Sequence, residues 1–124
     1  KAMQRLLPHS DPVRNNLAFY SLLLNVSTSS ANQTADELIA KYPTDPAIVS
    51  TYALSLLLRE RSVEALAALE QLPVAARESA QIAPYYALAL AKAGNMQRAS
   101  EVLTHADRGQ LLPEEEALLR GTKL

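Results

Sequence analysis

The chain has 124 residues, of which 48% are hydrophobic and 20% charged, so it has the size and composition of one globular domain and not of a disordered segment. Twelve Lys and Arg against 13 Asp and Glu leave a formal net charge of −1, which gives no electrostatic reason to expect nucleic acid or an anionic membrane as a partner. Cysteine is absent, which excludes disulfides and thiolate chemistry but does not fix the localisation, which stays unknown.

Ala and Leu dominate the sequence while aromatic residues make up 5%, a balance that favours an all-α fold with closely packed helices. The longest apolar runs, such as 52–58, are far shorter than the ~20 residues that cross a bilayer, so no membrane insertion is expected. The chain starts at Lys1, and residues 3–7 followed by Pro8 look like the end of a helix. We therefore expect a single domain, 1–124, cut from a longer chain.

A spacing of 34 residues organises the sequence. Asp45-Pro46 follows Asp11-Pro12 by 45 − 11 = 34 residues, and the segment 55–58 repeats the segment 21–24. One step further on, Tyr52-Ala53 returns at 86–87. A fixed period in this range is typical of repeat proteins, in which each unit buries its apolar face by stacking on its neighbours. The expected units are 11–44, 45–78 and 79–112.

The first two units each predict an antiparallel pair of helices. The first pair is expected at 11 to about 25 and about 31–42, with Asp11 as the cap and Pro12 at the first helical position. The second pair is expected from Asp45 to about 59, and from a cap at Ser62 to Pro73.

The third unit is less regular at its start. A helix that began at the register position of Asp45 would include Pro84, so we expect it to start late, near 81, or to bend there. It should end at Gly94, after which Asn95 caps a helix to about 106. Pro113 and three glutamates then predict a seventh helix, about 113–120, because a first helical turn favours negative charge.

These units resemble the tetratricopeptide repeat, in degenerate form. The resemblance rests on small residues at the close crossing of two helices and on apolar residues of the first helix. Those residues are Ala31, Ala65 and Ala99 on the second helices, and Val49, Tyr52, Ala53 and Leu56, then Ala83, Tyr86, Ala87 and Leu90, on the first. The resemblance implies a right-handed α-solenoid of helix pairs.

The repeats depart from the family pattern in several places. Phe19 follows Ala18 in the first unit, as though the large and small residues had exchanged positions, and only Pro43 stands at the closing proline position. Two alternatives stay open: an Ala/Leu-rich helical bundle without repeats, and another kind of helical repeat that stacks by the same physics.

Catalytic and metal-binding groups are not suggested by the sequence. The two histidines, His9 and His105, are expected far apart in the stacked units, and no cysteine accompanies them, so we expect no enzyme, no cofactor and no metal site. The three carboxylates at 114–116 are interpreted as the charged start of a helix.

The resemblance implies a function in binding a protein or peptide, because the first helices of such pairs line a concave groove that commonly holds a partner's peptide or helix. The expected groove residues are Asn16, Tyr20, Leu23, Ser50, Thr51, Leu54, Leu57, Gln81, Tyr85, Leu88 and Lys92. The carboxylate clamp of one subfamily uses lysines, asparagines and an arginine, and it is not supported here because the corresponding positions hold Asn16, Tyr20, Thr51, Gln81 and Tyr85. Alternatively, Leu118 and Leu119 or the segment Leu6-Leu7 fill this groove from within the chain.

Two other functions remain open at the level of sequence. The chain is alternatively a structural interior segment of a longer repeat array, with further repeats on its apolar end faces. It is also compatible with a regulatory arm of an enzyme that lies outside these residues. The partner's identity and the oligomeric state are not determined by the sequence.

Overall fold

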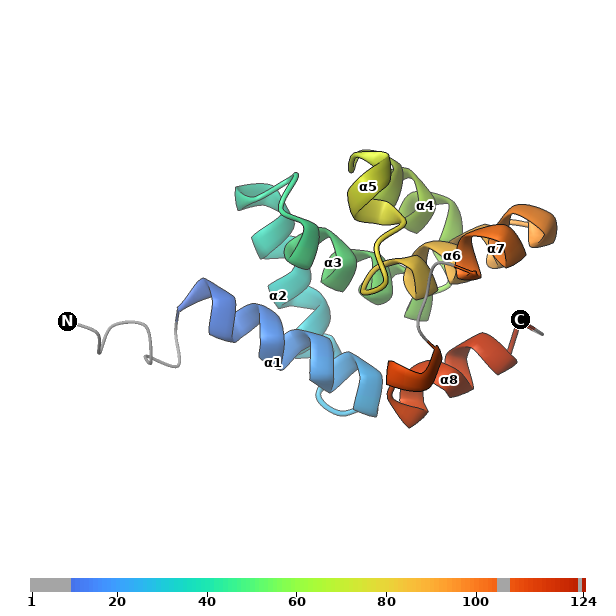
Figure 1. Ribbon diagram of the computed structural model, residues 1–124. Coiled ribbons are helices and arrows are strands. Elements are labelled where there is room, and N and C mark those ends of the chain that lie inside the picture. Colours follow the sequence, from blue (N-terminus) through green and yellow to red (C-terminus); the bar gives the residue numbers. More distant parts are fainter. Residues whose placement is uncertain (1–9, 105–107, 123) are drawn as a thin grey trace.

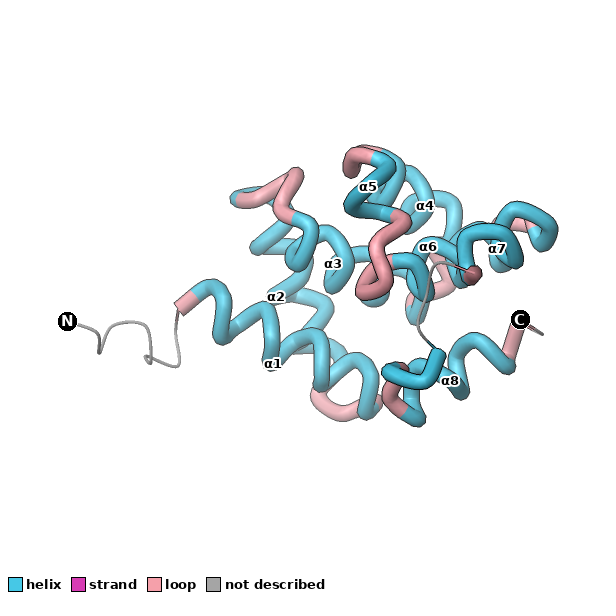
Figure 2. The backbone as a smooth tube through the Cα atoms, viewed as in Figure 1, coloured by secondary structure: helices cyan, strands magenta, loops and turns pink. Residues whose placement is uncertain are grey.

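The fold is all-α in the computed structural model, which describes residues 10–104, 108–122 and 124. Eight α-helices and no strand occur in these ranges (Figures 1 and 2). The helices are α1 (Asp11–Leu24), α2 (Thr28–Lys41), α3 (Pro46–Leu58), α4 (Ser62–Glu70), α5 (Val74–Arg77), α6 (Ala83–Lys92), α7 (Met96–Leu103) and α8 (Pro113–Arg120), with a 3-10 turn at Arg108–Gln110 before α8. None of the helices in the described ranges is long and apolar enough to cross a membrane.

The junction of the second and third units differs most from the seven-helix expectation. The four-residue helix α5 fills part of the segment 74–81, where the sequence pattern predicts no clear element. The next helix, α6, starts late, at Ala83, and Pro84 lies in its first turn. A proline is tolerated there because the first turn of a helix has no intrahelical acceptor for its N–H groups. The expected end of α7 near 106 falls at residues 105–107, outside the described residues.

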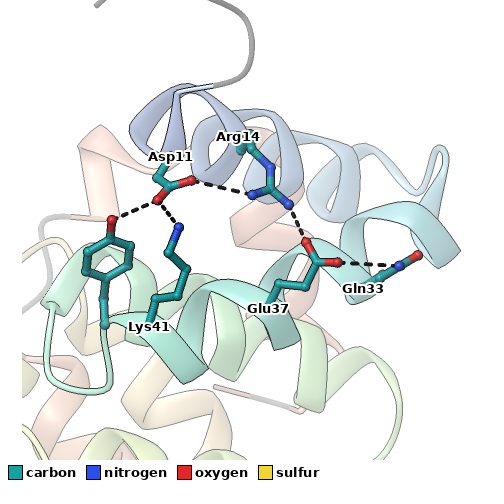
Figure 3. Close-up of polar contacts among 6 residues, drawn as sticks. Asp11, Arg14, Gln33, Glu37 and Lys41 are labelled. Carbon is teal, nitrogen blue, oxygen red and sulfur yellow. Dashed lines mark hydrogen bonds and ion pairs between the residues drawn. The ribbon is translucent and has the colours of Figure 1, made fainter.

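The two Asp-Pro helix starts behave differently. Asp45 caps α3 as expected, since one carboxylate oxygen accepts from the N–H groups of Ala47 at 3.0 Å and Ile48 at 3.3 Å. Asp11 is the first residue of α1 and makes no cap. Its carboxylate turns instead to Lys41 Nζ at 2.8 Å and the Tyr42 hydroxyl at 2.7 Å (Figure 3). The prediction of Asp11 as a cap was therefore wrong, because a charged partner on α2 competes for it.

The helices pack in the order of the chain. The pairs α1 with α2, α3 with α4, and α6 with α7 are in contact, and α2 also packs on α3 as α4 packs on α6. Ala31, Ala65 and Ala99 are at most 4% exposed, which agrees with their expected place at close helix contacts. The main core lies between α3, α4, α6 and α7, and a smaller cluster joins α1 and α2 to Leu54 and Tyr85.

The turns inside the second and third pairs share one geometry. Glu60 has φ 61° and Gly94 has φ 98°, and these residues are 94 − 60 = 34 positions apart. After each, a backbone N–H closes back on the helix: Arg61 to Leu56 O and Asn95 to Leu90 O, both at 2.8 Å. This is the closing bond of a helix that ends in the left-handed conformation. The 34-residue period is thus visible in the backbone as well as in the sequence.

Candidate partner-binding surface

The predicted groove residues divide into two sets in the structure. Five of them are at most 3% exposed: Thr51, Leu54, Leu57, Tyr85 and Leu88. Leu23 and Ser50 are partly exposed, and four are exposed, namely Asn16, Tyr20, Gln81 and Lys92. The centre of the expected groove is therefore part of the protein interior, and an open apolar groove through Leu54 and Leu88 was a wrong expectation for these residues.

Helix α8 accounts for part of this burial, and α1, α2 and α4, which pack on α3, account for much of the rest. Helix α8 packs against α6 and against the distant α1, so it bridges the first and third helix pairs (Figure 1). Leu118 contacts both hydrophobic clusters, and Leu119 is 1% exposed. The alternative prediction was that the chain itself fills the groove, with Leu118 and Leu119 as the filling residues. The segment Leu6-Leu7, also named, lies outside the described residues.

A hydrogen bond anchors α8 over the third pair. The Tyr85 hydroxyl donates to the carboxylate of Glu115 in the first turn of α8. Burial, together with this bond to a carboxylate, raises the pKa of Tyr85 far above its ordinary value. Phe19 of α1 packs edge-to-face on the Tyr85 ring at 5.8 Å between centroids. Tyr85 is thus a structural centre that connects α1, α6 and α8.

One end of the expected groove stays open. A cavity of about 520 Å³ lies between the C-terminal ends of α1 and α3, the start of α2, and α8. Leu22, Leu23 and Leu118 contribute apolar wall, and Asn32, Arg59 and Glu114 contribute polar groups. This volume is within the ~300–1,000 Å³ usual for ligand sites. Of the predicted groove residues, Leu23 alone lines this cavity.

The polar side of this cavity is held in place by hydrogen bonds. The buried Ser55 hydroxyl donates to the Asn32 side-chain oxygen at 2.7 Å, and Arg59 Nη2 donates to the same hydroxyl at 2.6 Å. Arg59 also pairs with Asp36 at 3.1 Å, and its Nε donates to the Ser55 carbonyl oxygen at 3.2 Å. A guanidinium fixed by three acceptors loses little further rotamer freedom on binding, so this wall is preorganised for polar contacts.

The side chains around this cavity offer apolar and polar groups for contacts with a ligand. No group of three His, Cys, Asp or Glu side chains suited to a metal ion occurs in the described part of the chain. Both histidines, His9 and His105, lie outside the described residues. What the described cavity offers is an apolar wall, an amide, a guanidinium and a carboxylate.

Sequence reasoning missed most of the cavity lining. The repeat register places none of Leu22, Asn32 and Arg59 in the groove, and α8 lies outside the repeats altogether. One signal was available: Leu118 and Leu119 are apolar residues in a helix otherwise rich in charge, which indicates a buried stripe.

The outer face of the first pair has a different kind of opening. Leu17 is 60% exposed, beside a shallow groove of about 150 Å³ between α1 and α2 that Arg14 and Ser21 also line. One period later the same three positions hold Ile48, Thr51 and Ser55, and these are at most 6% exposed. They lie in α3, the helix on which α1 and α2 pack.

Comparisons with models of protein families, with curated proteins and with solved structures found no match to this chain.

Proposed function

We propose that this protein is a protein–protein interaction scaffold, built from tetratricopeptide-like helix pairs stacked as a right-handed α-solenoid, that binds a peptide or helix of a partner. The binding site in this proposal is the open end of the groove, around Leu23, and not its filled centre. The partner segment places an apolar side chain against Leu23 and Leu118, with main-chain groups near Asn32 and Arg59.

The observation that carries the proposal is the 520 Å³ cavity at the ends of α1, α3 and α8. Its wall combines apolar surface with an arginine and an amide whose positions are already fixed. A site of this composition suits a peptide, whose side chains are apolar and whose main chain needs donors and acceptors. The 34-residue period, in sequence and in turn geometry, supports the stacked arrangement.

The experiment is a selection from a displayed random-peptide library on the immobilised chain, followed by fluorescence-anisotropy titration of the enriched peptides. Leu23→Glu places a charge on the apolar wall and should abolish binding, because burying an unpaired carboxylate is strongly unfavourable. Leu17→Glu is the matched control, since Leu17 lies on the same helix and is 60% exposed on another face. Peptides that bind both variants like wild type would contradict this site.

A second function is favoured by the outer face of α1 and α2: an interior segment of a longer repeat array. Leu17 is exposed at a register position where Thr51 is 1% and Tyr85 is 3% exposed. Terminal units of repeat proteins usually carry a polar outer face, so an exposed leucine there favours coverage by another helix pair.

The test of this second function compares the 124-residue chain with the complete natural chain. Leu17→Asp should change the melting temperature of the 124-residue chain little, because exposed substitutions usually alter stability by less than ~0.5 kcal/mol. In the complete chain it should be clearly destabilising. If Leu17→Asp leaves the melting temperature of both chains unchanged, no further helix pair covers Leu17.

A further inference from the structure

Helix α8 is anchored over the groove by a few of its side chains. Leu119 is its only buried residue, Leu118 is half-buried, and Ala117 is exposed. The Glu115 carboxylate accepts the hydrogen bond from the Tyr85 hydroxyl. A helix of eight residues is too short to be stable alone in water, so α8 is helical because of the contacts that hold it on α6 and α1 (Figure 1).

The side chains that hold α8 lie on one face of this helix. Glu115, Leu118 and Leu119 are at positions i, i+3 and i+4, which are neighbours on a helix surface. Tyr85 and Leu88 of α6 line the contact with them, and the space between these side chains is too small for a water molecule. The groove centre is therefore closely complementary to a short helix with the pattern Glu-x-x-Leu-Leu.

The fit of α8 is looser beside this face. Ala117 has the smallest side chain of the helix, and it lines the 520 Å³ cavity together with Leu22, Leu23 and Leu58. A second cavity, of about 410 Å³, adjoins Glu115 in the first turn of α8. Protein interiors are usually close-packed, and side chains beside an empty space lose dispersion contacts. An occupant of the groove with a larger apolar side chain at the position of Ala117 would make contacts that α8 lacks.

We propose that the groove centre binds an amphipathic helix of a partner protein in place of α8, which is the resident competitor for this surface. The partner helix has the pattern Glu-x-Φ-Leu-Leu, where Φ is a large apolar residue at the position of Ala117. Its glutamate accepts from the Tyr85 hydroxyl, and its residue Φ packs on Leu23 and Leu58. In the scaffold function proposed above α8 stays in place, whereas here it is displaced.

The residue at the position of Ala117 determines how well a partner competes. Because α8 is tethered, its effective concentration at the groove is on the order of millimolar, and a free helix with the same contacts competes poorly with it. Burying about two further methylene groups strengthens binding about tenfold. A partner helix with a large apolar residue at this position therefore competes about tenfold better than a helix with the sequence of α8.

The first test is a fluorescence-anisotropy titration of the 124-residue chain against three labelled peptides of residues 112–121. One peptide has the natural sequence, one carries Ala117→Leu, and one carries Ala117→Leu together with Leu119→Glu. The Ala117→Leu peptide should bind about tenfold more tightly than the natural peptide. The peptide with Leu119→Glu should not bind, because burying an unpaired carboxylate is strongly unfavourable. Equal affinities of the first two peptides would overturn the role of the cavity, and binding of all three alike, or of none, would overturn the proposed surface.

A variant that loosens α8 tests whether this helix is the competitor. Glu115→Ala in the chain removes the acceptor of the Tyr85 hydroxyl and of the Leu112 N–H at the start of α8, so the groove is open more often. The affinity of the Ala117→Leu peptide, which supplies its own glutamate, should rise about three- to tenfold, the range for loss of one hydrogen bond. Glu64→Ala is the matched control, because it removes a glutamate side chain that is 57% exposed on α4, and it should leave the affinity unchanged. No rise in Glu115→Ala, or an equal rise in both variants, would overturn the competition.

Hydrogen exchange of the wild-type chain detects the displacement itself. A saturating amount of the Ala117→Leu peptide should accelerate exchange of the chain's own α8 amides about tenfold or more, and it should leave the amides of α4 and α7 unchanged. Unchanged exchange in α8 would mean that the peptide binds without displacing this helix, and the proposal would be wrong. These peptides derive from α8 and not from the library selection, so their failure leaves the scaffold function around Leu23 to be decided by that selection.

Discussion

The turn at Gly94 provides a direct test of the repeat geometry. Gly94 has φ 98°, and a Cβ built on it would meet no atom within 4 Å. Gly94→Ala therefore introduces no clash, and its cost is backbone strain alone. The left-handed conformation costs an L-residue about 1–2 kcal/mol, and restriction of the unfolded chain returns about 0.4–1 kcal/mol. The expected net loss is about 1 kcal/mol, or roughly 3–5 °C in melting temperature for a domain of this size.

Glu60 allows the reverse substitution, because it occupies the equivalent turn with φ 61° and is not a glycine. Glu60→Gly should relieve the strain and leave the melting temperature unchanged or up to about 4 °C higher. The two turns do not share partners, so the double variant should show the sum of the single effects. Thermal denaturation followed by circular dichroism measures all three. A wild-type melting temperature in Gly94→Ala would refute the reasoning, since the turn would then not require a positive φ.

Three further predictions concern the core and the ion pairs. Ala65→Leu and Ala99→Leu should each lose about 1–3 kcal/mol by overpacking, and wild-type melting in both would mean that the helix contacts are misplaced. Leu54→Ala should lose about 2–5 kcal/mol in urea denaturation because Leu54 is 0% exposed, whereas a groove residue on the surface would lose far less. The hydrogen bond from Lys41 lowers the pKa of Asp11, so its stabilisation is present above the unfolded-state pKa and is lost as the pH falls through the folded-state value. Asp11→Asn should therefore lower stability at neutral pH and reduce the acid sensitivity of unfolding.

The helices were predictable because their signals are local. Asp45-Pro46, Gly94-Asn95 and Pro113 each determine a cap or a turn from a few neighbouring residues, and the structure places helix ends within about three residues of them. The helix α5 was not predictable in the same way, because the segment 74–81 has neither a cap nor a clear period.

Whether the groove is open or filled depends on a contact that no local sequence signal specifies. The register assigns Leu54 and Leu88 to equivalent positions of their helices, but it does not tell what packs against these positions. Leu118 packs there, 64 residues after Leu54 and outside the 34-residue period. Contacts between a repeat and a non-repeated helix have no periodic counterpart in the sequence, so apolar surface alone cannot distinguish a binding groove from an interior.

The departures from the repeat register differ in how the fold compensates them. Phe19 stands where a small residue is expected, and the ring of Tyr85 receives it at 5.8 Å. The buried hydroxyl of Ser55 has both a donor and an acceptor partner, in Arg59 and Asn32. Asn15 occupies a core position as well, yet its buried side-chain oxygen has no donor among the described residues. Burying such a group unpaired costs about 1–3 kcal/mol, which packing alone gives no reason to retain.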